Sequence, residues 1–140
     1  MPRFVLLYHD CPPNYERASH WDFMLESGDV LRTWALERLP RDWRVAFTRT
    51  SAVYMNCPLL AADNTVAATR LGDHRRDYLE LEGPLSGDRG IVMRIAAGMY
   101  RSEHESADDW RVVLTGDALA ARVSLTRSEV GNEHWVLFSA

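Results

Sequence analysis

The chain is built from short runs in which apolar and polar residues alternate, and most of these runs are separated by glycine-containing turns. The clearest runs cover residues 3–8, 20–26, 30–37, 77–83, 91–98, 110–116, 118–127 and 134–140. Alternation with a period of two is the pattern of a β-strand with one buried face. Many short strands at this spacing predict a mainly β fold, namely a compact antiparallel β-barrel formed by a single domain of residues 1–140.

Local signals add a hairpin and little helix. Residues 20–26 and 30–37 flank the turn Ser27-Gly28-Asp29, which predicts a β-hairpin. Residues 39–44 fit one short helical turn, and residues 58–71 fit either a short helix or an irregular crossing. The prediction is therefore a barrel with one or two short helices.

Composition and charge narrow the function classes. The formal net charge is −4, so nucleic-acid binding would need a local basic patch. All 16 basic residues are arginine, which suits phosphate contacts but equally reflects base composition of a genome. Cys11 and Cys57 form no CxxC motif and are expected to be free thiols. The first apolar run is too short for a signal peptide or membrane span, which predicts a cytoplasmic protein without a membrane partner.

One polar strand face is a candidate metal site. In residues 20–26, His20 and Asp22 share a face with Met24, whereas the opposite face is apolar. His9 ends the preceding run, so pairing of the two strands would bring it to His20 and Asp22. Two imidazoles and one carboxylate suit a divalent transition metal. The alternative is that His20 and Asp22 are solvent-facing residues of a half-exposed strand.

A second polar cluster lies in residues 73–78. His74 and Tyr78 have the chemistry of a proton-transfer residue and a phosphate ligand, with Arg75 and Arg76 beside them. The alternative is a charged loop that precedes a strand. His104 and His134 lie in polar stretches and are expected at the surface.

The ordered set of motifs resembles one family, the 3′-phosphoesterase domain of bacterial DNA ligase D. The motifs are FVLLYHD (4–10), HWDFMLE (20–26), GDVLRTWAL (28–36), DHRRDYLELEG (73–83), PLSGDRGIV (84–92) and HWVLF (134–138). They cover nearly the whole chain. The resemblance implies a manganese-binding barrel that removes a 3′-ribonucleoside and then a 3′-phosphate from nucleic-acid 3′ ends in DNA repair, with a separate DNA ligase or polymerase as a further partner.

The resemblance also assigns residues. It implies that the metal ligands, for Mn²⁺ or another divalent ion, are His9, His20 and Asp22. It implies that His74 and Tyr78 contact phosphate and transfer protons. The family carries a phosphate-binding arginine where this chain has Met24, and Arg70, Arg75 and Arg76 are the candidates to supply that charge.

The spacing of the histidines also differs from the family pattern. Ten residues separate His9 from His20, where the family has five, so the extra residues must form a loop. Asp10 or Cys11 is the alternative ligand if His9 does not reach the site.

Three functions stay open at this point. The first is a metal-dependent 3′-phosphoesterase, and the second is a non-catalytic module of the same fold that binds a phosphorylated end or a partner protein. The third is a phosphoesterase for a small nucleotide, which the acidic net charge permits.

Overall fold

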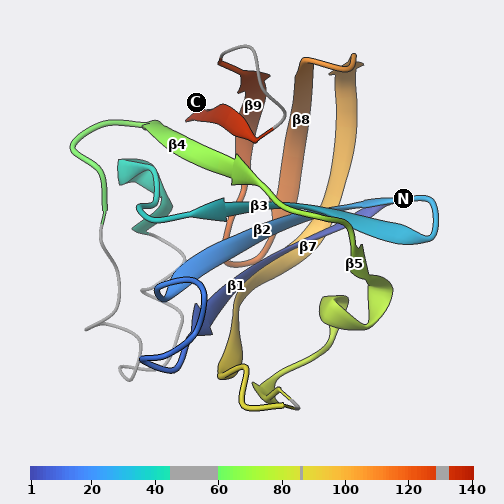
Figure 1. Ribbon diagram of the computed structural model, residues 1–140. Coiled ribbons are helices and arrows are strands. Elements are labelled where there is room, and N and C mark those ends of the chain that lie inside the picture. The colour runs from blue at the N-terminus through green and yellow to red at the C-terminus, as the bar shows by residue number, and fades with distance from the viewer. Residues whose placement is uncertain (45–59, 86, 129–132) are drawn as a thin grey trace.

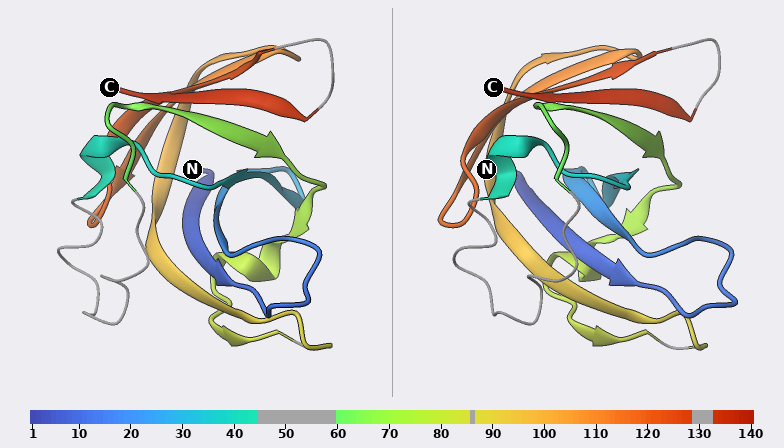
Figure 2. Two further views of the ribbon diagram at one scale, coloured as in Figure 1. Left: turned by 60° about the vertical axis from the view of Figure 1, so that its left-hand side comes forward. Right: turned by 90° about the vertical axis from the view of Figure 1, so that its left-hand side faces the viewer.

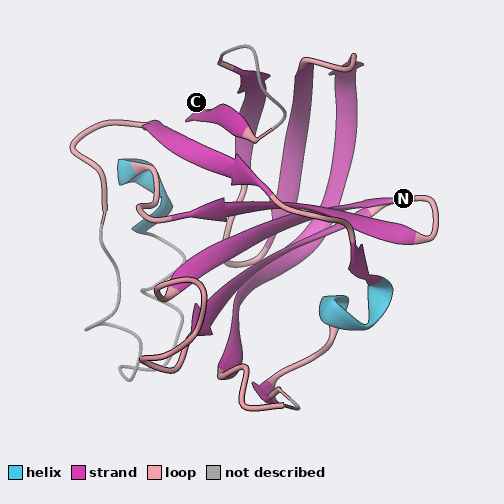
Figure 3. Cartoon of the chain, viewed as in Figure 1, coloured by secondary structure: helices cyan, strands magenta, loops and turns pink. Residues whose placement is uncertain are grey.

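The structure is a computed structural model that describes residues 1–44, 60–85, 87–128 and 133–140 (Figure 1). Strands dominate it, and the helical segments in these residues are two 3₁₀ turns, η1 (Arg41–Arg44) and η3 (Arg76–Leu79) (Figure 3). The strands are β1 (Arg3–Asp10), β2 (His20–Ser27), β3 (Val30–Leu36), β4 (Thr65–Arg70), β5 (His74–Arg75), β6 (Gly83–Pro84), β7 (Ile91–Glu105), β8 (Asp109–Gly116), β9 (Ala121–Arg127) and β10 (His134–Ser139).

Eight of these strands close into an antiparallel barrel, as the alternating pattern predicts. Their order is β1-β2-β3-β4-β10-β9-β8-β7, and β7 returns to pair with β1. Closure depends on the length of β7. Its first half pairs with β1 from Ile91 to Met99, and its second half continues past β1 to pair with β8 (Figure 2). A closed barrel leaves no long unpaired edge in this ring.

The main core fills the barrel. Phe4, Trp21, Phe23 and Leu25 point inward from β1 and β2 and are almost completely buried. The predicted apolar face of residues 20–26 is therefore confirmed. Tryptophans from distant strands complete this core, because the Trp34 ring lies 5.7 Å from that of Trp135 between centroids.

A second apolar cluster covers the outside of the sheet. Val5, Leu7, Met24, Leu31 and Val92 lie on the outer face of the strands, and Tyr78 and Leu79 of η3 pack onto them. Residues 77–83 were predicted to be a strand, and this prediction is wrong. Tyr78 and Leu79 instead lie in a 3₁₀ turn that packs on the outer face, Leu81 packs beside them partly buried, and only Gly83 enters a strand.

The other predictions concern the hairpin, the short helices, the cysteines and membrane spans. The hairpin of β2 and β3 is confirmed, with Gly28 at a positive φ of 61° in its turn. The helical turn within residues 39–44 is confirmed as η1. For residues 58–71, a short helix or an irregular crossing is expected. In the described part of this range, Thr65–Arg70 instead form strand β4, which pairs with β10. Cys11 is a free thiol, and Cys57 lies outside the described residues. Within the described ranges, no helix has the length and apolarity needed to cross a membrane.

Candidate metal centre

The β1–β2 hairpin places two histidines directly opposite each other. His9 and His20 are register partners at the open end of the hairpin, and their ring centroids lie 5.2 Å apart. Each is less than one-tenth exposed, and Asp22, two residues along β2, is 3% exposed. The alternative in which His20 and Asp22 face solvent from a half-exposed strand is therefore wrong. η3 and its neighbours cover this face of the sheet, and the polar residues lie at the margin of the covered area.

Backbone carbonyls fix the orientation of both imidazoles. The Nε2 atom of His9 lies 2.7 Å from the carbonyl oxygen of Arg89, and the Nδ1 atom of His20 lies 2.8 Å from that of Ala18. Since a carbonyl oxygen only accepts hydrogen bonds, these ring nitrogens carry the protons. The remaining nitrogens, Nδ1 of His9 and Nε2 of His20, therefore present lone pairs when the rings are neutral. Metal-binding histidines are commonly held by such bonds.

Both of these free nitrogens face the Asp22 carboxylate. The His20 Nε2 atom is 3.0 Å from Asp22 Oδ1, and the His9 Nδ1 atom is 3.9 Å from Asp22 Oδ2. With the proton of the neutral His20 ring on Nδ1, the Nε2 atom has no N–H to donate to Asp22 Oδ1. Asp22 Oδ1 is consequently a buried oxygen without a hydrogen-bond partner among the described residues. Leaving a charged oxygen in that state is costly, so the arrangement favours a cation between the three side chains.

The electrostatics of His20 agree with this reading. Burial works to lower the pKa of His20, but the Asp22 carboxylate outweighs burial, and the net effect raises the pKa. Positive charge is thus favoured between His20 and Asp22. A proton or a divalent ion can supply that charge, and only the ion is able to bind His9 Nδ1, His20 Nε2 and Asp22 together.

Each histidine lies at a distance from an Asp22 oxygen that one metal ion can span. Two donors that bind one ion at about 2.1 Å lie roughly 3.0 Å apart when adjacent in an octahedron and roughly 4.2 Å apart when opposite. The separations of 3.0 Å for His20 and 3.9 Å for His9 fall within this range, and they end on different Asp22 oxygens, Oδ1 and Oδ2. Two imidazoles and one carboxylate are also a donor set that transition metals accept with coordination positions left open.

Cys11 offers a second donor set. Donor atoms of His9, Cys11 and His20 lie within 4.8 Å of one another. However, the Cys11 Sγ atom lies 4.0 Å from His20 Nδ1, the nitrogen that donates to Ala18. Burial, followed by the charges of Asp22 and Asp10, raises the pKa of the Cys11 thiol to about 11, which opposes the thiolate form that metals require. The Cys11 set has the more closely gathered donor atoms, and the set with Asp22 has the donors that need no proton removed from a thiol or from His20 Nδ1.

His9, His20 and Asp22 line a cleft of about 330 Å³ that is also lined by part of the second polar cluster of the sequence, through Asp73 and His74. One wall comes from β1, β2 and their connecting loop, through His9, Tyr15, Glu16, Arg17, His20 and Asp22. The other wall comes from the segment that leads into β5, through Leu71, Gly72, Asp73 and His74. Residues more than fifty positions apart in the chain thus line one cleft, and the structure brings His9, His20, Asp22 and His74 together there.

Tyr78 does not line the cleft itself, and its link to the cleft is its ring contact with His74. The Nδ1 atom of His74 donates to the carbonyl oxygen of Gly72 at 2.9 Å, which leaves Nε2 for a ligand. The edge of one ring meets the face of the other in the His74–Tyr78 pair, with centroids 5.1 Å apart. Tyr78 itself is 8% exposed and belongs to the outer apolar cluster rather than to the cleft lining.

The three arginines proposed for phosphate lie outside the cleft lining. The Arg70 guanidinium donates to the carbonyl oxygens of Thr33 and Leu71, pairs with Asp73, and lies over the Trp34 ring. Through these contacts Arg70 holds the segment that leads to His74 in place. The other two behave differently: Arg75 is exposed on β5, and Arg76 pairs with Glu26 at 2.7 Å.

Sequence reasoning missed Arg17. This residue lies in the loop between His9 and His20 and lines the cleft. The available signal was its position in the sequence, because a loop that joins two candidate metal ligands, His9 and His20, must begin and end at the candidate site. Met24, in contrast, is fully buried in the outer cluster and does not face the cleft. His104 and His134 are exposed, as expected.

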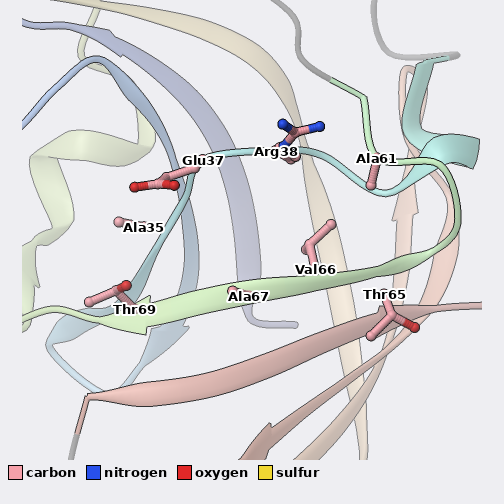
Figure 4. Close-up of a pocket in the computed structure, with 8 residues that line it drawn as sticks. All are labelled: Ala35, Glu37, Arg38, Ala61, Thr65, Val66, Ala67 and Thr69. Carbon is pink, nitrogen blue, oxygen red and sulfur yellow. The ribbon is translucent and has the colours of Figure 1, made fainter.

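A groove continues from the cleft along the seam between β3 and β4. These strands pair only at Trp34–Arg70 and Ala35–Thr69 and then diverge. A pocket of about 420 Å³ lies beyond that point, with small side chains along β4 and Arg38 and Glu37 at its margin (Figure 4). A further pocket of about 540 Å³ shares Ala35, Glu37 and Thr69 with it and reaches His20.

Comparison of the chain with protein-family models and with curated proteins found no match.

Proposed function

We propose that this protein is a divalent-metal-dependent phosphoesterase that acts on 3′-ribonucleoside or 3′-phosphate ends of nucleic acid and leaves a 3′-hydroxyl. The observation that carries the proposal is the buried Asp22 carboxylate, whose Oδ1 atom lacks a hydrogen-bond partner among the described residues and lies near His20, while its Oδ2 atom lies near His9. Asp22, His9 and His20 would hold the metal, with Mn²⁺ expected from the resemblance. When bound, such an ion polarises a phosphoryl oxygen and lowers the pKa of a coordinated water.

Groups around the proposed metal ligands orient the imidazoles, contact the phosphate and position His74. The carbonyl oxygens of Arg89 and Ala18 keep the two imidazoles in the orientation that presents Nδ1 of His9 and Nε2 of His20. His74 lines the same cleft, and its Nε2 is available to donate to a phosphoryl oxygen or to protonate a leaving oxygen. Tyr78 positions the His74 ring through their edge-to-face contact.

The groove favours a chain of nucleotides over a small nucleotide. The pockets along β3 and β4 continue from the cleft, so a strand whose 3′ end occupies the cleft would have space for the nucleotides that precede it. A DNA ligase or polymerase would be the downstream partner because either enzyme needs the 3′-hydroxyl that this reaction yields. A small-nucleotide substrate predicts a weak salt dependence of binding, whereas a strand predicts a steep one.

The test is conversion of a 3′-phosphorylated primer to a 3′-hydroxyl primer by purified protein with Mn²⁺. His20→Ala and Asp22→Asn are expected to abolish conversion, and chelation of the metal should do the same. His134→Ala is the matched control, since this histidine is exposed and lies outside the cleft lining. Conversion that survives both substitutions at His20 and Asp22 would overturn the assignment.

A second function is favoured by one observation. Met24 is buried, and Arg70, Arg75 and Arg76 do not line the cleft, so the side facing a phosphate carries less positive charge than the resemblance implies. A non-catalytic module that binds a phosphorylated 3′ end, or a partner protein, would have this character. It predicts metal-dependent binding of the 3′-phosphorylated primer without release of phosphate.

A further inference from the structure

We propose that Arg17, in the loop between the two metal-binding histidines, is the cation that contacts the phosphoryl group of the ligand. This inference rests on the proposed function, because it assigns the phosphate contact of the same site. Arg17 is the only arginine among the described residues that line the cleft with His9, His20, Asp22 and His74. It is close enough to His20 and Cys11 to interact electrostatically with both.

The loop that carries Arg17 is tied to the site at several points. The Cys11 backbone N–H donates to Ser19 Oγ at 2.9 Å, and Ser19 Oγ donates to Asp10 Oδ1 at 3.3 Å. Tyr15 packs against the His9 ring, with centroids 5.7 Å apart. The inserted residues therefore fold against the metal-binding set, and they form one wall of the cleft.

The Arg17 guanidinium is available to a ligand. It has no hydrogen bond or ion pair within the described parts of the chain, and its residue is exposed. The contrast with Arg70 is clear, because three backbone or carboxylate oxygens already occupy that guanidinium. A guanidinium binds phosphate through two parallel hydrogen bonds, which a surface arginine at the mouth of a cleft is able to form.

The charge balance of the cleft explains why one arginine matters. Its acidic groups are Glu16, Asp22 and Asp73, and Arg70 neutralises Asp73. The groups that oppose them are Arg17 and any metal ion held by Asp22. An anion therefore meets an acidic cleft until the metal binds, and phosphate binding should require both the metal and Arg17.

The test measures two affinities separately for wild-type protein and variants. Mn²⁺ affinity is measured by electron paramagnetic resonance, and affinity for inorganic phosphate is measured from the ³¹P relaxation caused by protein-bound Mn²⁺. Arg17→Gln is expected to weaken phosphate binding about tenfold, the size of one charge-assisted contact. Its Mn²⁺ affinity should be unchanged or slightly higher. Arg17→Lys should regain part of the phosphate affinity, and Arg101→Gln, an exposed arginine on β7, should match the wild type.

The outcomes separate this inference from the proposed function. Equal phosphate affinity of wild type and Arg17→Gln, both loaded with Mn²⁺, would overturn the role of Arg17 and leave the metal site standing. A loss of Mn²⁺ affinity in Arg17→Gln would also overturn it, because Arg17 would then support the fold of the loop. Wild-type protein that binds Mn²⁺ but does not relax phosphate would overturn the proposed function together with this inference.

Discussion

Gly90 packs against the end of β1. At this point the His9 ring donates a hydrogen bond to the carbonyl oxygen of Arg89. The φ of Gly90 is 96°, and a Cβ atom placed there would lie 2.1 Å from the carbonyl oxygen of Asp10. Replacing Gly90 by alanine therefore strains the backbone and forces Asp10 away. Because Asp10 follows His9 directly, the displacement should loosen the hydrogen bond of 2.7 Å between His9 Nε2 and Arg89.

The expected cost follows from these two effects. A positive φ in a residue with a Cβ atom costs about 1–3 kcal/mol. Real Cβ contacts do not fall below 3.0 Å, so the Asp10 carbonyl must move by roughly 1 Å, which disturbs the pairing of Asp10 with Ile91 at a cost of about 1 kcal/mol. We therefore expect Gly90→Ala to lower the free energy of unfolding by about 2–4 kcal/mol. Mn²⁺ affinity should fall by about tenfold or more, as when a partner of a metal ligand is lost.

Gly87 provides a matched control in the same turn. Its φ is 71°, but a Cβ atom there would meet nothing within 4 Å. Gly87→Ala should cost about 1–2 kcal/mol of strain and leave Mn²⁺ affinity unchanged. Urea unfolding and a Mn²⁺ titration measure the two quantities for both variants. Equal stability and equal Mn²⁺ affinity of the two variants would refute the role assigned to Gly90.

Two further predictions concern Met24 in the outer cluster and Tyr100 in the main core. Met24→Ala should cost about 2–5 kcal/mol in urea unfolding and Met24→Leu less than about 1.5 kcal/mol, because Met24 is fully buried. Met24→Arg should be at least as destabilising as Met24→Ala, and wild-type stability of that variant would show that its side chain escapes to the cleft. Burial, followed by the charges of Glu105 and Glu26, raises the pKa of Tyr100 from 10.0 to about 12. The unfolded chain then loses this proton at a lower pH than the folded protein, so stability should fall as pH rises from about 10 to about 12. Tyr100→Phe should remove that component of the pH dependence, and an identical slope in the variant would contradict it.

The strands were predictable because burial in a barrel imposes a period of two. Trp21, Phe23 and Leu25 alternate with His20, Asp22 and Met24, and this pattern gave both the hairpin and its inner face. The same pattern misled for residues 77–83. Tyr78 and Leu79 are apolar residues of a 3₁₀ turn that packs on the outside of the sheet. The pattern of apolar and polar residues alone does not distinguish a strand from a short turn that covers a strand.

The site was predictable in part. Register brings His9 to His20, and strand period brings Asp22 to the same face, so both relations follow from the sequence. The orientation of the imidazoles does not follow, because it depends on the carbonyl oxygens of Arg89 and Ala18. The route of the loop that carries Arg17 depends on its tertiary contacts, which pattern and propensity do not encode.

The central claim is that His9, His20 and Asp22 bind one divalent metal ion. Its most direct test is a Mn²⁺ titration followed by electron paramagnetic resonance, comparing wild-type protein with Asp22→Asn and Cys11→Ser. Wild-type protein and Cys11→Ser should bind one Mn²⁺ with similar affinity. Asp22→Asn should bind at least about 100-fold more weakly, since loss of an outer partner of a ligand already costs about 10- to 100-fold. Undiminished binding by Asp22→Asn, or its loss in Cys11→Ser, would contradict the account.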